Sequence, residues 1–186
     1  GGAPEEITYI GKPHVGTDIL KDVVKNIRKK IIQLGGEVRF SSKLEYINKE
    51  NGKVKSIIVN GEEISCEAVI LALGHSARDT YEMLYEVGLE MAQKAFAIGV
   101  RIEHPQDLIN KSQYGKFHNH PKLKAADYKL TYQCKESRRG VYSFCMCPGG
   151  VVVAAASEEG RVVTNGMSYH ARDLENANSA LVVQVH

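Results

Sequence analysis

Residues 69–73 are five apolar residues in a row, Val-Ile-Leu-Ala-Leu, and Gly74 follows them directly. Such a run predicts a strand covered on both faces, as in a parallel sheet. Ser76 and Asp79 are spaced as in a capping box, which predicts a helix immediately after the glycine. A strand end that feeds a helix N-terminus is a common place for phosphate groups. The junction therefore predicts part of a nucleotide-binding edge, although the chain carries no G-x-G-x-x-G fingerprint.

Composition excludes several other classes of protein. The net charge is +2, and the densest basic group, residues 25–30, falls late in a predicted helix, where cations complement the helix dipole. We therefore expect no nucleic acid as partner. No apolar run reaches the roughly 18 residues of a membrane span, and no secretory opening is present, so we expect a cytoplasmic protein away from membranes. Its four cysteines are then expected to be free thiols.

The rest of the chain predicts an α/β (α+β) fold. Apolar residues at helical spacing, with Thr17 or Asp18 as cap and Gly35-Gly36 as terminator, predict a helix over 17–34. Asn-Gly pairs at 51–52 and 60–61 predict a β-meander over 43–65. The remaining expected elements are strands at 7–10, 37–40, 95–103, 128–134, 141–145, 151–156, 161–164 and 182–186, helices at 76–87 and 105–111, and a polar loop at 112–127.

Several segments together resemble a bacterial family of uncharacterised FAD-dependent, NAD(FAD)-utilising dehydrogenases. They are Gly16 to Leu20 with Arg28, Gly35 to Phe40, Ala72 to Thr80, Cys145 to Gly150 and Asn165 to Ser168. The resemblance implies that residues 1–93 are the middle part of a discontinuous, Rossmann-like FAD-binding domain. It implies that residues 94–186 are an inserted antiparallel, β-rich substrate domain. The glycine-rich turn of the family is absent, so we expect an internal fragment that is inactive and binds little FAD by itself.

The same resemblance implies the cofactor contacts. Gly74, His75, Ser76, Arg78 and Asp79 would lie beside FAD and offer backbone N–H groups and polar side chains. The plain alternative is a tight strand–helix turn without a ligand. Val38 matches the position from which related flavoproteins meet the adenine, and its alternative is an ordinary core valine. NAD(P)H is the electron donor that the resemblance suggests.

The candidate catalytic residues are Cys147, His170 and Arg172. Cys145 and Cys147 would share one face of a strand, as small buried hydrophobes, as a substrate-facing thiol or, with Cys134 and a histidine, as zinc ligands. We expect no metal, because no paired C-x-x-C spacing occurs. Arg172 can pair with a carboxylate or phosphate, and His170 can act as acid or base, in a loop that can equally be plain solvated surface.

Two further loops complete the candidates. Lys12 and His14 can donate hydrogen bonds to a flavin or an anion, or belong to a turn before the helix. The polar loop over 112–126 supports a rival interpretation, a non-catalytic β-rich binding module. The favoured reading is part of an FAD-dependent oxidoreductase of unknown substrate, and it also predicts self-association through an apolar sheet edge at Val38 and Val69.

Overall fold

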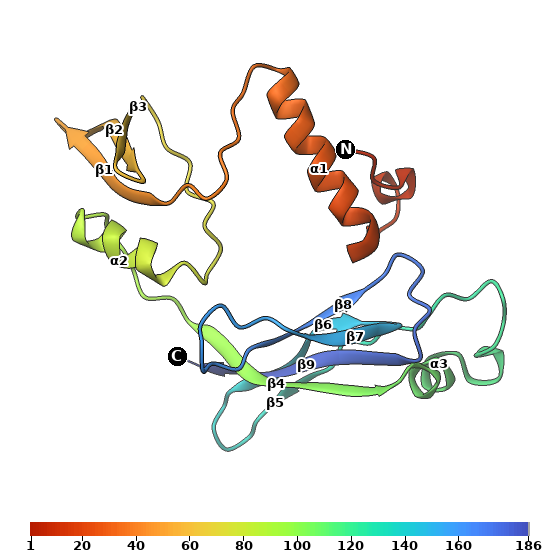
Figure 1. Cartoon of the computed structure of the whole chain (residues 1–186). Helices are drawn as coiled ribbons and strands as arrows, with labels where there is room; N and C mark the ends of the chain where they lie inside the picture. Colours follow the sequence, from red (N-terminus) through yellow and green to blue (C-terminus); the bar gives the residue numbers. More distant parts are fainter. Residues whose placement is uncertain (186) are drawn as a thin grey trace. The chain divides into compact units, whose positions relative to one another are not determined.

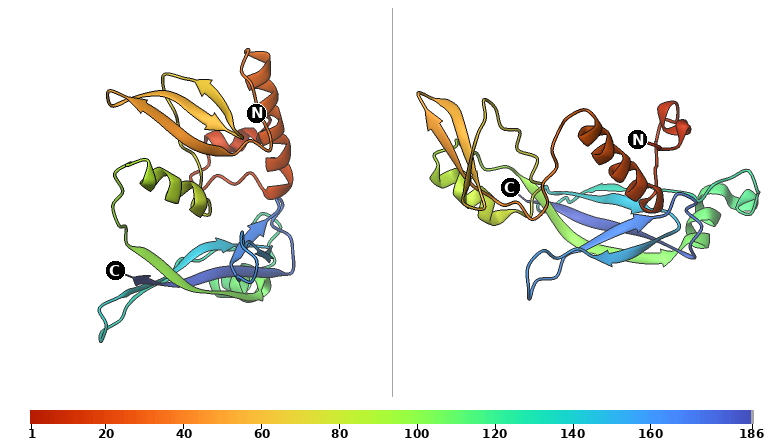
Figure 2. Two further views of the ribbon diagram at one scale, coloured as in Figure 1. Left: turned by 60° about the vertical axis from the view of Figure 1, so that its left-hand side comes forward. Right: turned by 45° about the horizontal axis from the view of Figure 1, so that its top comes forward.

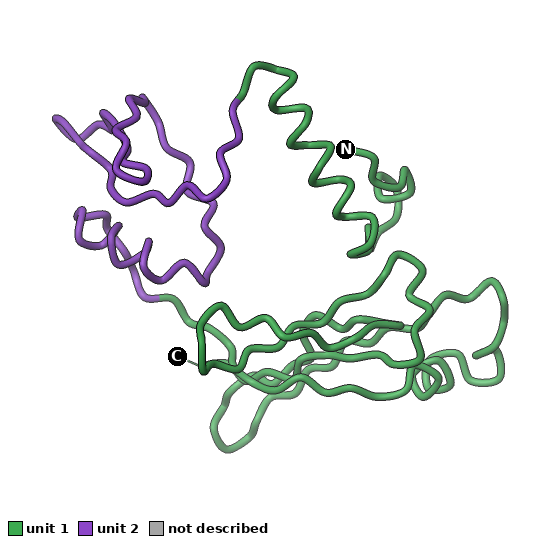
Figure 3. The backbone as a smooth tube through the Cα atoms, viewed as in Figure 1, with its two compact units in different colours: residues 1–36, 94–186 green, residues 37–93 purple. Residues whose placement is uncertain are grey.

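The chain divides into two compact units, which we describe separately. A computed structural model describes residues 1–185 (Figure 1). Unit 1 contains residues 1–36 and 94–186, and unit 2 contains residues 37–93 (Figure 3). The expected domains, 1–93 and 94–186, share the second of these boundaries, and the domain division of the whole protein stays a prediction. No helix among residues 1–185 is both long and apolar enough to cross a membrane.

Unit 1 is built on a four-stranded antiparallel sheet in the order β4-β9-β6-β5. Its longest pair joins β4 (Phe96–Pro105) to β9 (Asn176–Val185), and β6 (Gly140–Cys147) and β5 (Thr131–Gln133) follow. The hairpin of β7 (Gly150–Ala154) and β8 (Thr164–Ser168) packs on one face of this sheet (Figures 1 and 2). The short helices α3 (Gln106–Tyr114) and η2 (Gly115–Phe117) follow β4. The expected antiparallel β-rich region is therefore present.

The N-terminal part of unit 1 is a 3₁₀ helix, η1 (Glu5–Thr8), followed by α1 (Thr17–Gln33). Helix α1 ends as expected, because Gly35 takes φ +87° and the N–H groups of Gly35 and Gly36 donate to Ile32 and Ile31. It starts differently from the expectation: Gly16 is the N-cap, and no side chain caps the helix. No residue of α1 is buried, so its apolar stripe, which includes Leu20, stays open.

Unit 2 holds a meander of three antiparallel strands and one helix. The strands are β1 (Leu44–Glu50), β2 (Lys53–Val59) and β3 (Glu62–Ser65), and the helix is α2 (Arg78–Glu86). Asn51-Gly52 and Asn60-Gly61 all take positive φ, as the tightest hairpin turns require. Leu84 of α2 is 2% exposed, and with Ile47 of β1 it forms the small apolar core of the unit. The predicted meander is confirmed.

Three expected strands are absent, and a fourth, expected at 161–164, is displaced toward the C-terminus. Residues 68–73 pair with no strand among residues 1–185, and the Ile70 side chain is 93% exposed. A β-strand needs a neighbouring strand to pair its backbone N–H and C=O groups, and this segment has none there. Residues 37–40 are a loop, residues 7–10 overlap η1, and β8 begins only at Thr164. Every strand pair among residues 1–185 is antiparallel, so no parallel sheet is formed in this part of the chain, and the Rossmann-like assignment stays a prediction. The C-terminal strand is present as β9, and His186 lies outside the described residues.

The remaining differences are smaller. Helix 105–111 extends to Tyr114, which shortens the polar loop expected at 112–127. Val38 and Val69 do not form strand edges, so the predicted apolar edge is absent at these positions. Exposed apolar side chains do gather on β4, an edge strand whose Phe96, Ile98 and Val100 are all exposed. Self-association stays a prediction.

Candidate functional site

A cleft of about 700 Å³ opens in unit 1 between segments that are distant in the sequence. Its walls come from the N-terminal segment 6–14, the first turn of α3, residues 123–125 and the β8–β9 turn at 170–174. The cleft therefore contains both His170 and Arg172, which the sequence singled out, together with Lys12 and His14 from the loop before α1. The structure brings these two predicted groups into one site.

His170 is held by contacts to the N-terminal segment. Its backbone N–H donates to the Asp18 carboxylate at 2.9 Å, and its Nδ1 lies 3.1 Å from the Val15 carbonyl. A carbonyl only accepts, so Nδ1 carries the proton and Nε2 remains, 3.7 Å from a Glu6 carboxylate oxygen. The bond from the His170 N–H holds the pKa of the Asp18 carboxyl below its usual value. Asp18 thus connects α1 to the β8–β9 turn instead of capping the helix.

His14 and Lys12 are also tied down, which limits their roles. His14 Nε2 lies 2.9 Å from the Tyr169 carbonyl, and its ring is parallel to that of His170 with centroids 6.4 Å apart. Lys12 forms an ion pair with Asp127 at 2.9 Å. Both residues therefore connect the N-terminal segment to the rest of unit 1.

Arg172 is the least satisfied cation of the cleft. It takes φ +53°, and its backbone lies so close to Gly149 that a Cβ there would overlap the Arg172 carbonyl. Its Nε is buried and has no hydrogen-bond partner among the described residues. Asn165 to Ser168, directly before the β8–β9 turn, belong to β8. Both catalytic candidates in the turn, His170 and Arg172, line the cleft.

The predicted cofactor junction lies in unit 2. Gly74 takes φ +66°, so the expected sharp turn is present, and its carbonyl accepts a hydrogen bond from the Tyr81 hydroxyl. The expected capping box is absent: Ser76 Oγ lies 3.2 Å from His75 Nδ1, and Asp79 accepts from the Thr80 N–H at 2.9 Å. His75, Ser76, Arg78 and Asp79 are exposed around this turn.

Asp79 is the acidic residue in the first turn of α2. Its carboxylate forms an ion pair with Lys43 at 2.7 Å, which together with the Thr80 N–H holds its pKa below the usual value. The charge of Asp79 is therefore paired, and its carboxylate already accepts one N–H group of the first turn of α2. A pyrophosphate would have to displace this carboxylate from the Thr80 N–H, whereas neutral polar contacts to a ligand are compatible with the exposed side chains.

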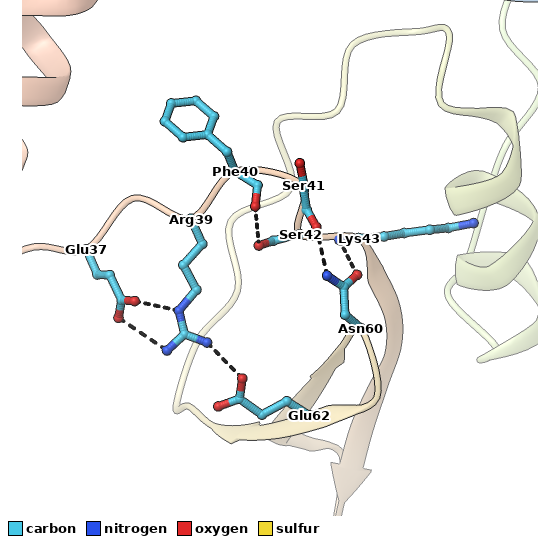
Figure 4. Close-up of polar contacts among 8 residues, drawn as sticks. All are labelled: Glu37, Arg39, Phe40, Ser41, Ser42, Lys43, Asn60 and Glu62. Carbon is cyan, nitrogen blue, oxygen red and sulfur yellow. Dashed lines mark hydrogen bonds and ion pairs between the residues drawn. The ribbon is translucent and has the colours of Figure 1, made fainter.

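Val38 lies in a loop that side chains clamp onto the β2–β3 turn (Figure 4). Arg39 bridges Glu37 at 2.6 Å and Glu62 at 3.1 Å, and this pairing holds the pKa of Glu37 below its usual value. Asn60 accepts from the Lys43 N–H at 2.9 Å and donates to the Ser41 carbonyl at 2.7 Å. Val38 itself is half-buried, so its assignment to adenine stays a prediction.

Cys147 belongs to a buried polar cluster that the sequence did not single out. Arg101 Nη1 donates to Asn178 Oδ1 at 2.7 Å and to the Cys145 carbonyl at 3.3 Å, and the Cys147 thiol donates to the same carbonyl at 3.4 Å. A bulge between Phe144 and Cys147, with Cys145 at φ +49°, buries Cys147 and exposes Cys145. The expectation that the two thiols share a face is therefore wrong. A charged residue between Val100 and Ile102 was the sequence signal for this cluster.

The thiols are expected to differ in reactivity. Burial, and then the neighbouring Cys145, raise the pKa of Cys147, whereas a hydrogen bond from Ser137 lowers the pKa of Cys134. Because the thiolate is the nucleophile, iodoacetamide at neutral pH should modify Cys147 the slowest of the four thiols, by about tenfold or more. Mass spectrometry of timed samples measures the order. Alkylation of Cys147 before Cys145 would contradict the buried placement.

The structure offers no assembled metal site among residues 1–185, because no three His, Cys, Asp or Glu side chains come together there. Cys147 is the last residue of β6, whereas Cys134 directly follows β5 and forms a hydrogen bond with Ser137. The cleft and the α2 junction therefore remain the two places where the predicted site residues gather.

Comparisons with known proteins agree with the motifs. Residues 95–186 match a family described as FAD-dependent protein, C-terminal domain-like, and residues 13–98 match flavin containing amine oxidoreductase. The chain is 72% identical over 184 residues to an uncharacterized protein of Clostridium beijerinckii. That match covers 99% of the chain and 34% of the relative, so the chain spans about a third of the relative's length. The resemblance to FAD-dependent proteins is confirmed.

Proposed function

We propose that this chain, similar along nearly its whole length to FAD-dependent proteins, is an internal part of an FAD-dependent oxidoreductase. Residues 13–98 contribute to the FAD-binding side and residues 95–186 to the side that receives the substrate. The observation that carries the proposal is the adjacency of the two family matches, which meet at residues 95–98, beside the boundary between the units. FAD would supply the two-electron or hydride acceptor, and the protein would supply binding and orientation.

Open apolar surface on α1 supports a place inside a larger protein. Its members Leu20, Val24, Ile27, Ile31 and Ile32 are all exposed, along one stripe of an amphipathic helix. An amphipathic helix normally covers such a stripe with another element. Since the chain spans 34% of its relative, we propose that further segments of the complete protein cover this stripe.

The residues at the α2 junction fit the rim of a flavin site better than its phosphates. His75 and Ser76 are exposed and carry hydrogen-bonding groups beside the open turn at Gly74. Asp79 already accepts the Thr80 N–H at the helix end, so we assign the pyrophosphate to residues outside this chain. The electron donor in this proposal is NAD(P)H, and the location is the cytoplasm.

Flavin content tests the proposal. The complete natural protein and this 186-residue chain would be purified side by side, and their visible absorbance read at the flavin band. We expect a yellow complete protein, bleached by NAD(P)H without oxygen, and a colourless chain. A complete protein that is colourless and takes up no added FAD would overturn the proposal and favour a non-catalytic binding module.

A variant pair then tests the assigned rim. His75→Ala in the complete protein should weaken FAD binding by about 3- to 10-fold, the value of one or two lost hydrogen bonds. His120→Ala is the matched control, because His120 is also exposed but lies in unit 1. Flavin fluorescence titration gives both affinities. Equal affinities would remove the rim from the proposal while leaving the flavin itself in place.

A further inference from the structure

Two cationic side chains line the unit 1 cleft without an ion pair among the described residues. Among its charged lining residues, Lys12 pairs with Asp127, Asp107 pairs with Lys111 at 2.6 Å, and Glu6 faces His170. Lys124, Arg172 and Asp173 have no ion pair among the described residues. Lys124 and Arg172 therefore offer positive charge to an anion in the cleft, although the carboxylates of Glu6 and Asp173 equal them in number.

Arg172 gives this positive charge a specific position. The β8–β9 turn is fixed, because the Arg172 N–H donates to the Tyr169 carbonyl at 3.1 Å and the adjacent His170 is bonded to Asp18 and Val15. A buried guanidinium nitrogen without an acceptor is uncommon in a folded protein and costs stability. A guanidinium that no protein acceptor satisfies is suited to bind an oxyanion through two parallel hydrogen bonds.

The neighbouring groups add shape and polarity to the same place. The buried Gln106 side chain accepts from the Gly149 N–H at 2.8 Å and donates to Asn110 and to the Ala126 carbonyl, so this wall is rigid and already satisfied. The two ring nitrogens that face backbone carbonyls, one in His14 and one in His170, act as donors. His170 Nε2 lies beside the cleft, 3.7 Å from a Glu6 carboxylate oxygen.

We propose that this cleft binds a small oxyanion, the carboxylate or phosphate group of a ligand, through Arg172, with Lys124 as the second cation. The inference goes beyond the flavin proposal, because binding of the oxyanion requires no flavin. A carboxylate and a phosphate both present two oxygen atoms that a guanidinium can bind with two hydrogen bonds. The experiment below distinguishes the two groups.

Calorimetric titration of the complete protein with inorganic phosphate and, separately, with succinate tests the proposal. We expect one of the two probes to bind at millimolar concentration or tighter, and the tighter probe identifies the ligand chemistry. Arg172→Gln should weaken that binding by about tenfold or more, and Lys124→Gln by less. Arg172→Lys keeps the charge without the paired bonds, so it should bind with intermediate affinity.

Controls separate a lost site from a lost fold. Arg161→Gln removes an exposed arginine of the β7–β8 loop, whose nearest carboxylate is Glu158 at 3.6 Å, and should leave probe affinity unchanged. Each variant's thermal midpoint and flavin absorbance are recorded, so a failure of the flavin proposal remains distinct from a failure here. Absence of binding by both probes, or wild-type affinity in a folded Arg172→Gln protein, would overturn the oxyanion site.

Discussion

Gly16→Ala is expected to destabilise unit 1 by about 3 kcal/mol or more. Gly16 is buried and takes φ +88° with ψ 143°, a region that side chains rarely adopt. A Cβ built there would overlap the His170 backbone N–H and lie 2.5 Å from Asp18 Oδ1 and 2.6 Å from His170 Cα. The substitution therefore separates the start of α1 from the β8–β9 turn and opens the cleft.

Gly11→Ala is the matched control for this substitution. Gly11 lies in the same N-terminal segment, is exposed, and has no atom within 4 Å of an added Cβ, so its effect should stay within about 0.5 kcal/mol. Urea unfolding measures both variants, and amide hydrogen exchange shows whether α1 loses protection first. Equal stability of the two variants would mean that α1 does not dock at His170.

Local signals predicted the elements whose structure is decided within a few residues. The two Asn-Gly pairs set the hairpins of unit 2, since their positive φ angles match the twist of neighbouring strands. Gly35-Gly36 ended α1 through two backbone hydrogen bonds. The strand expected at 95–103 forms most of β4, whose ten-residue ladder with β9 is the longest among the described residues.

The prediction of a strand at residues 68–73 was wrong because a β-strand forms only when a second strand pairs with it. Their composition is that of a doubly covered strand, yet no partner strand among residues 1–185 aligns with them. The strand predicted at 37–40 is a loop, because contacts distant in the sequence decide its conformation. Arg39 finds its partners in Glu37 and Glu62, and the second of these lies 23 residues away, so the local pattern gave no sign of the clamp.

The sequence predicted individual candidate residues, and the structure shows that four of them line one cleft. His170 and Arg172 were chosen for their chemistry, and Lys12 and His14 were chosen separately from another loop. Contacts across 152 and 155 residues of sequence join the two groups. No spacing rule reports such a pairing, which is why the sequence treated them as two sites.

Asn178→Ala is the second large expected effect, a destabilisation of unit 1 by about 3 kcal/mol. Asn178 is 0% exposed, and its Oδ1 accepts the 2.7 Å hydrogen bond from Arg101. Removal of this acceptor leaves Arg101 Nη1 with only the longer bond to the Cys145 carbonyl, at 3.3 Å, beside Arg101 Nε, which is buried without a partner among the described residues. Urea unfolding measures the loss, and faster alkylation of Cys147 should accompany it as the bulge loosens.

Asn178→Asp separates the acceptor from the rest of the side chain. The carboxylate keeps an oxygen for Arg101 and removes Asn178 Nδ2, which has no acceptor among the described residues. A charge paired with Arg101 should therefore cost less stability than alanine at the same position. In an Arg101→Met background, Asn178→Ala should lose most of its effect, because no buried donor is left unsatisfied. If aspartate and alanine destabilise equally, the Arg101 bond does not hold the bulge, and the burial of Cys147 depends on packing alone.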